Sequence, residues 1–155
     1  MKLLPDDRDW IDKALFAINA VEAGPSDADI TNAPVLSDWM PAISPFSHVI
    51  LVGKVVGHPT LGTRSITTSQ LIAIHPEAGW ARTVSRWYGL AQPKPASKEI
   101  FASNLGLKSP IAARFAITGF ITLANLGDLD EILSANIVQI RQIDAADRAA
   151  SEQED

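Results

Sequence analysis

Apolar residues in the first part of the chain recur at the spacing of one helix face. Residues that follow the i, i+3, i+4, i+7 spacing are Ile11, Ala14, Leu15, Ile18 and Val21. Such a spacing places side chains along one side of an α-helix. Pro5 suits a first helical position, and Gly24-Pro25 supplies a stop. The pattern therefore predicts an amphipathic helix over residues 5–23.

Prolines interrupt the next stretch. Pro34, Pro41 and Pro45 fall within residues 34–45, and proline disfavours both helix and a central strand. We expect residues 34–45 to form an extended linker that is held in place by its large apolar side chains.

Three segments rich in β-branched residues follow at short range. They read HVILVGKVVGH (48–58), SITTSQLIAIH (65–75) and WARTVSRWYGL (80–90). Separated by glycine- and proline-containing turns, they predict an antiparallel meander of three or more strands. Another strand could close it into a small barrel. Gly53, inside the first segment, indicates a bulge or a close backbone approach.

The stretch GHPTLGTRSITTS (57–69) lies between the first two of these segments. His58 and the hydroxyl-rich run resemble catalytic material, but glycine and proline beside His58 are typical of a strand end. We interpret the stretch as a hairpin in which residues 60–64 turn and Ser65 begins the next strand.

Helical signals return after residue 97. Ser97 could cap a short helix that ends at Gly106, and Ser109-Pro110 favours a buried helix over 110–125. Asp128 with Glu131 resembles a capping box and predicts a third helix through about residue 148. Its expected inner face carries Leu133, Ile137 and Ile140. The remaining tail is expected to fray.

These elements predict one α+β domain over residues 1–155, with the helical segment packed on the sheet. We expect a helical and extended part over 1–47, a β core over 48–92, a helical part over 98–150 and a frayed tail over 151–155.

Composition limits the chemistry. The chain has no cysteine, which excludes disulfides and thiolate metal sites and fits a reducing cytoplasm. Its most apolar stretch, residues 111–126, contains Arg114 and is shorter than a membrane span. Acidic residues begin at Asp6, so no apolar signal-peptide core is present. We expect a cytoplasmic protein with no membrane partner.

Charge is distributed unevenly. Residues 1–47 carry a net charge of −5, residues 48–98 of +5 and residues 99–155 of −5. Any anion-binding role would therefore belong to the middle third. An acidic tail folded over the basic sheet would also explain this layout.

Candidate chemistry is sparse. His48, His58 and His75 lie far apart without a metal-binding spacing, so we expect no metal and no cofactor. Ser65 and Thr67 would share one strand face, where threonine rows are commonly structural. A hydrolase or transferase built around His58 remains a third reading, and we expect a protein that is not an enzyme.

The strand predicted over 80–90 carries the strongest surface signal. Alternation places Arg82, Arg86 and Tyr88 on one face, with Lys54 and Arg64 as further cations of the same third. Arginine and tyrosine are enriched in protein-binding hot spots. Basic and aromatic rows also bind single-stranded nucleic acid.

The strings APVLSDW (33–39), VGKVVGHPTLG (52–62), ITTS (66–69) and GWARTVSRWYGL (79–90) resemble a bacterial family that is known only as a domain of unknown function. The resemblance covers about residues 33–92 and implies no activity. Residues 98–155 lie outside it, as a specialised addition would.

Three functions stay open. We expect a binding protein that contacts a protein partner, as an accessory subunit or inhibitor. The alternative is a small single-stranded nucleic-acid binder that uses residues 80–90. The acidic flanks count against this alternative, because they repel phosphate.

Overall fold

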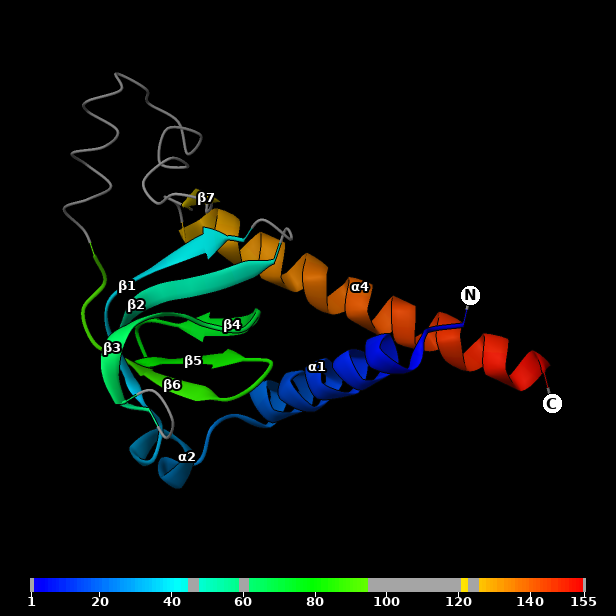
Figure 1. Ribbon diagram of the computed structural model, residues 1–155, viewed down its shortest axis with the longest axis horizontal. Coiled ribbons are helices and arrows are strands. Elements are labelled where there is room, and N and C mark those ends of the chain that lie inside the picture. The colour runs from blue at the N-terminus through cyan, green and yellow to red at the C-terminus, as the bar shows by residue number, and fades with distance from the viewer. Residues whose placement is uncertain (1, 45–47, 59–61, 95–120, 123–125, 155) are drawn as a thin grey trace, which may run out of the picture.

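The computed structural model describes residues 2–44, 48–58, 62–94, 121–122 and 126–154 (Figure 1). Its helices are α1 (Pro5–Ala23), α2 (Asp27–Thr31) and α4 (Leu126–Gln153). Its strands are β1 (Val35–Ile43), β2 (Val49–His58), β3 (Gly62–Thr67), β4 (Leu71–His75), β5 (Trp80–Thr83), β6 (Trp87–Leu90) and β7 (Ile121–Thr122). Within these ranges no helix combines the length and the hydrophobicity that crossing a membrane requires.

The helix predicted over residues 5–23 is confirmed as α1. Pro5 occupies its first turn with Asp6 and Asp7, where negative charge complements the helix dipole. At the other end Gly24 adopts φ 84° and donates its N–H to the carbonyls of Ala20 and Val21. Only glycine reaches this backbone conformation at low cost, so it ends the helix here.

The sheet is mixed, in the strand order β3-β2-β1-β6-β5-β4, and the two-residue β7 pairs with β1. Five of the pairings are antiparallel, but β1 and β6 run parallel. The predicted α+β class is confirmed, whereas the purely antiparallel meander is wrong. The sheet does not close into a barrel.

The expected linker over residues 34–45 is instead strand β1, in the middle of the sheet. Pro41, which led to that prediction, lies opposite Leu51 of β2 and is fully buried. On its other side, β1 pairs with β6 only up to Leu36 and with β7 only from Ala42. Proline lacks an N–H, and this gap between the two pairings tolerates its absence.

Gly53 of β2 marks the close approach that the sequence indicated. Opposite it, β1 has a register shift between Ser37 and Met40, and Asp38 there adopts φ 49°. A Cβ on Gly53 would lie 3.0 Å from the Ser37 carbonyl oxygen and 3.1 Å from the Trp39 Cα. Glycine is therefore required by the bulge of the neighbouring strand.

Two segments that the sequence predicted as single strands are each divided in two. The segment 65–75 forms β3 and β4, which lie at opposite ends of the strand order. At the break, Thr68 is buried; its N–H donates to the Leu51 carbonyl, and its Oγ1 accepts the Leu51 N–H at 3.0 Å. The hydroxyl-rich run is thus structural at Thr68. The antiparallel pairing of the predicted hairpin is confirmed, but β3 begins at Gly62 and not at the predicted Ser65, and residues 59–61 lie outside the described ranges.

The helix predicted from Asp128 is confirmed as α4, and Leu133 and Ile140 are buried on its inner face. The frayed tail is wrong, because α4 continues to Gln153. The predicted helix over 98–106 lies outside the described residues. So does most of the one over 110–125, although residues 121–122 are strand β7.

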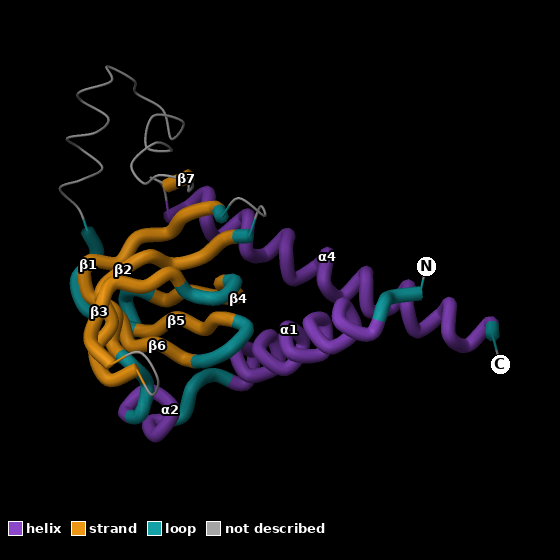
Figure 2. The backbone as a smooth tube through the Cα atoms, viewed as in Figure 1, coloured by secondary structure: helices purple, strands orange, loops and turns teal. Residues whose placement is uncertain are grey.

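Figure 2 shows the curled sheet with the two long helices, α1 and α4, beside it. These elements share two hydrophobic clusters. One lies inside the sheet under the start of α4 and includes Leu36, Leu51 and Leu129. The other joins α1 and α4 to β4 and includes Ile18, Ile72 and Ile140. The sheet is thus packed on both faces over part of its area. Successive side chains of β5 point to opposite faces of the sheet, and this alternation determines which of them remain at the surface.

Candidate functional site

The basic and aromatic row predicted over residues 80–90 does not form. Residues 84–86 turn the chain between β5 and β6, so the alternation breaks at Val84. Thr83 fastens this turn, since its Oγ1 accepts the backbone N–H groups of Ser85 and Arg86 at 3.2 Å each. Hydroxyl side chains commonly stabilise turns in this way. Thr83 followed by Ser85 was the sequence signal that could have predicted a turn here, and hence two short strands.

Two of the predicted contact residues are buried. Tyr88 is 4% exposed and lies opposite Ala81 in the inner cluster, where burial raises the pKa of its phenol. Arg82 is 7% exposed, and its Nε donates to the Thr83 carbonyl at 2.9 Å. Burial lowers the pKa of Arg82, and the carboxylate of Asp29 partly offsets this effect. Arg86, in the turn, is half-buried.

The other two candidate cations lie apart. Lys54 is exposed and pairs with Asp38 at 3.7 Å, while Arg64 is exposed on the edge strand β3. Lys54 lies opposite Ser65, and Arg64 lies opposite Val55. Successive residues of a strand face opposite sides, so Lys54 and Arg64 belong to different faces of the sheet. The five predicted contact residues therefore do not form a common basic surface.

The turn instead assembles a different row on the outer face of β4, β5 and β6. Trp80 stacks on His75 with ring centroids 5.1 Å apart, and it meets Trp87 edge-on at 5.3 Å. The Arg82 guanidinium lies over the Trp87 ring, 5.2 Å from its centroid. We call these four side chains the stacked row. Trp80 and Trp87 are half-buried.

An exposed phenylalanine lies beside one end of the stacked row. Phe16 of α1 is 71% exposed, whereas Ala17 and Ile18 next to it are buried. It lines a hollow of about 530 Å³ together with Lys13, Arg82 and Val84. A second hollow of about 340 Å³ lies at His75, with Glu77 and Asp130 on its walls. The stacked row therefore runs between two depressions of the surface.

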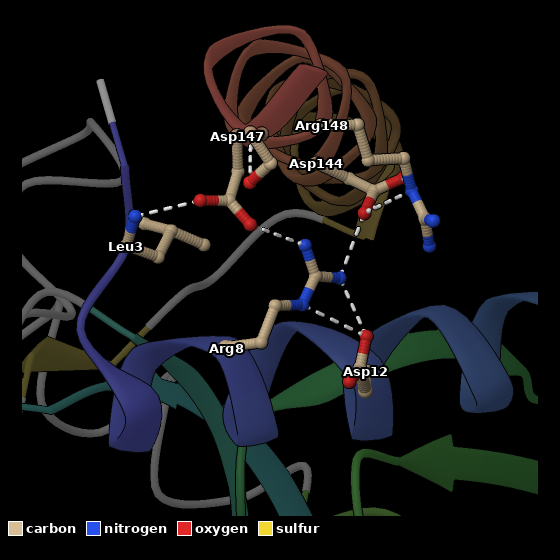
Figure 3. A network of polar contacts seen from close by, with 7 residues as sticks. Leu3, Arg8, Asp12, Asp144, Asp147 and Arg148 are labelled. Atoms are coloured by element: carbon tan, nitrogen blue, oxygen red, sulfur yellow. Dashed lines mark hydrogen bonds and ion pairs between the residues drawn. The ribbon is translucent and has the colours of Figure 1, made fainter. Parts of the chain in front are cut away.

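Asp144, Asp147 and Arg141 of α4 form ion pairs with α1. Arg8 of α1 donates to Asp12, to Asp144 at 2.7 Å and to Asp147 at 2.9 Å (Figure 3). Arg148 reaches the same Asp144 at 3.0 Å. An acidic tail folded over the basic sheet was one explanation of the charge layout, and Asp144 and Asp147 instead contact Arg8 of α1. The acidic end of α4 is neutralised by the first turns of α1.

These contacts change the pKa values of Asp144 and Asp147. The backbone N–H of Leu3 donates to Asp147 at 2.7 Å, and this bond with the Arg8 contact lowers the pKa of Asp147. Burial alone would raise the pKa of Asp144, but hydrogen bonds from Arg8 and Arg148 lower it. Both carboxylates are thus held ionised, as a structural clamp between two helices requires.

The described residues form a row of side chains suited to binding but bring together few side chains suited to catalysis. Within that part of the chain, no three histidine, aspartate or glutamate side chains come close enough to hold a metal ion. His58 ends β2 opposite Gly62, and its side chain lies outside the described set. The half-buried rings of Trp80 and Trp87, with the buried Arg82 against Trp87, are suited to contact another molecule by stacking and apolar burial.

Comparison with known proteins gives one match. The model of a family described as "Family of unknown function (DUF6634)" matches residues 1–155. No curated protein and no solved structure matches the chain. The match extends far beyond residues 33–92 and includes α4. That helix is therefore part of the family pattern rather than an addition to it.

Proposed function

The chain belongs to DUF6634, a family of unknown function, and from its geometry we propose that it is a binding protein that docks a protein partner. It would act as an accessory subunit or an inhibitor, without catalysis of its own. The observation that carries this proposal is the stacked row with Phe16 beside it. Tryptophan and arginine are the residue types most enriched in binding hot spots.

Exposed aromatic area supports this function. Phe16 keeps most of its surface in water, and Trp80 and Trp87 are only half-buried. A partner that covered them would remove apolar surface from water at about 25 cal/mol per Å². The hollow between Phe16 and Arg82 offers a pocket for an anchoring side chain.

The charges nearby favour a protein over nucleic acid. Arg82 is buried against Trp87 and has Asp29 in its vicinity. Asp12 lies on the wall of one hollow, and Glu77 and Asp130 lie on the walls of the other. Binding to single strands needs several cations that follow the phosphates. The stacked row supplies one arginine among these carboxylates.

The test compares two surface variants of the full chain. Phe16→Ser removes the exposed ring beside the hollow. Val138→Ser is the matched control, because Val138 is 54% exposed on α4 and does not line either hollow. Both proteins would be tagged and used in pull-downs from native lysate, with and without nuclease. Quantitative mass spectrometry would identify the proteins that are retained.

We expect a stoichiometric protein partner that survives nuclease, binds the Val138→Ser variant normally and loses at least tenfold in recovery with Phe16→Ser. A partner retained equally by both variants would contradict the proposed surface. Nucleic acid in the untreated sample, with every partner lost after nuclease, would support the nucleic-acid alternative instead.

A further inference from the structure

A second site, independent of the proposed function, lies where α1, α4 and two strand ends meet. Trp10 of α1 stacks on His48, just before β2, with ring centroids 6.0 Å apart and planes inclined by 23°. Two cavities of about 420 Å³ and 210 Å³ flank this pair, and both are lined by Trp10, His48 and Ile143. Their combined size is that of a small-molecule pocket.

The smaller cavity is lined by amides. Gln70, just before β4, shares its wall with Asn136 and Gln139 of α4. The Oε1 of Gln70 is buried and has no hydrogen-bond partner among the described residues. The backbone of Gln70 is held in place, since its carbonyl accepts the Val84 N–H at 2.9 Å. A buried acceptor of this kind calls for a hydrogen-bond donor.

The charged residues that line the cavities indicate which kind of hydrogen-bond donor would bind there. The larger cavity is lined by Asp6 and Asp7, and neither cavity has a lysine or arginine in its described lining. The indole of Trp10 adds a π-face, which attracts cations. Carboxylates at the wall, an indole face and a buried carbonyl oxygen are together complementary to a group that carries positive charge and N–H donors.

We propose that this pocket binds an organic cation with N–H donors, of the amine, amidine or guanidine class. The cationic head would donate to the Oε1 of Gln70 and lie against Trp10. Asp6 and Asp7, on the wall of the larger cavity, would attract the cation from the other side of the Trp10–His48 pair, and Ile140 and Ile143 would cover the apolar body. Such a group occurs both in free amines and in the arginine side chains of peptides.

Benzamidine and benzamide make a matched pair of probes, because the two have the same ring and nearly the same shape, but only benzamidine is charged. Calorimetric titration of the full chain with each would be combined with the NMR shift of the Trp10 indole N–H. We expect benzamidine to bind at least tenfold more tightly than benzamide and to shift the Trp10 signal. Equal binding of the two probes, or no binding at millimolar concentration, would overturn the proposal.

Gln70→Leu separates a ligand role from a structural one. The variant removes the buried acceptor and keeps the volume similar, so we expect an unchanged or higher melting temperature and a loss of at least tenfold in benzamidine affinity. Asp7→Asn should weaken binding several-fold and make it less sensitive to salt. Unchanged benzamidine affinity in Gln70→Leu would contradict the site.

The source of the cation is distinguished by a second ligand. An acetylated and amidated Gly-Arg-Gly peptide would be titrated beside agmatine, a free guanidine with an amine tail. Tighter binding of the peptide would assign the pocket to an arginine side chain of a protein, and tighter binding of agmatine to a free small molecule. Binding of neither would overturn the proposal.

Discussion

Gly53 shows how a single residue depends on the strand next to it. The bulge of β1 brings the Ser37 carbonyl oxygen and the Trp39 Cα within 3.1 Å of the position that a Cβ would occupy. Both are backbone atoms of the central strand, so they move only if the strand moves. Gly53→Ala should therefore lower the free energy of unfolding by about 2 kcal/mol, as measured by urea denaturation.

Gly89 provides the control. It also lies in a strand, but the nearest atom to its added Cβ is Cγ2 of Val35, at 3.4 Å. A side-chain methyl can adjust, and alanine costs less backbone entropy than glycine. Gly89→Ala should change stability by less than about 1 kcal/mol. Equal losses in the two variants would show that the bulge does not constrain Gly53.

Arg82 and Tyr88 carry the main residue-level error of the sequence analysis. Their types and spacing were read as one exposed face, because alternation assumes an unbroken strand. The turn at residues 84–86 reverses the chain, so Tyr88 enters the core while Trp87 takes the outer face. A tertiary reversal of this kind is weakly encoded, here only in the turn chemistry of Thr83.

Elements far apart in sequence meet at the clamp of Arg8. Three carboxylates surround its guanidinium, and two of them belong to α4. Arg8→Ala would leave Asp144 and Asp147 without their shared cation in a partly buried place. We expect it to reduce the free energy of unfolding by about 2 kcal/mol, as measured by thermal and urea denaturation.

Arg148→Ala is the matched control, because Arg148 is an exposed side chain whose ion pair among the described residues is with Asp144 of its own helix. Exposed ion pairs within one helix contribute about 0.3–0.5 kcal/mol. A loss with Arg148→Ala as large as that with Arg8→Ala would show that the contact between helices adds nothing.

The helices were the predictable elements. Periodicity and end signals placed α1 at the observed residues, and a capping pattern placed the start of α4 within two residues. Both signals are local, since a helix closes its own hydrogen bonds. Strand β1 was missed because its partners β2, β6 and β7 lie elsewhere in the sequence, and the gap between the pairings with β6 and β7 makes Pro41 tolerable.

Lowering the pH should reduce the stability of the whole molecule through the contacts of Arg8 with Asp144 and Asp147. Asp144 and Asp147 have lowered pKa values in the folded protein, so the unfolded chain binds protons more readily near its ordinary carboxyl pKa of about 3.9. Their stabilisation is complete well above that value and is lost as pH falls through it towards the lower folded pKa values. Urea midpoints at pH 7, 5, 4 and 3 would show the decline.

Asp147→Asn should flatten this decline, because one of the two linked carboxylates no longer titrates. The variant starts less stable at pH 7 and loses less between pH 5 and pH 3. Asp130→Asn, at an exposed position of the same helix, should keep the wild-type dependence. An undiminished decline in Asp147→Asn would assign the acid sensitivity to other groups.

At the scale of the molecule, the parallel contact of β1 and β6 joins two antiparallel halves into one sheet. It separates β3 from β4, although only three residues connect them in the chain. The Arg8 clamp and the Trp10–His48 pocket each combine segments that are distant in sequence, whereas the stacked row lies within residues 75–87 and depends on the turns that join β4, β5 and β6. None of the three could be read from spacing alone.

The sequence by itself determined the α+β class, the first and last helices, the hairpin after Gly57 and the need for glycine at position 53. Each of these follows from local periodicity, capping or backbone freedom. Only the tertiary structure decided which aromatic residues are exposed, which arginines are buried and where the acids of α4 find their cation. Those outcomes depend on strand order and helix contact, which join residues as far apart as Leu3 and Asp147, 144 positions, and leave no local pattern.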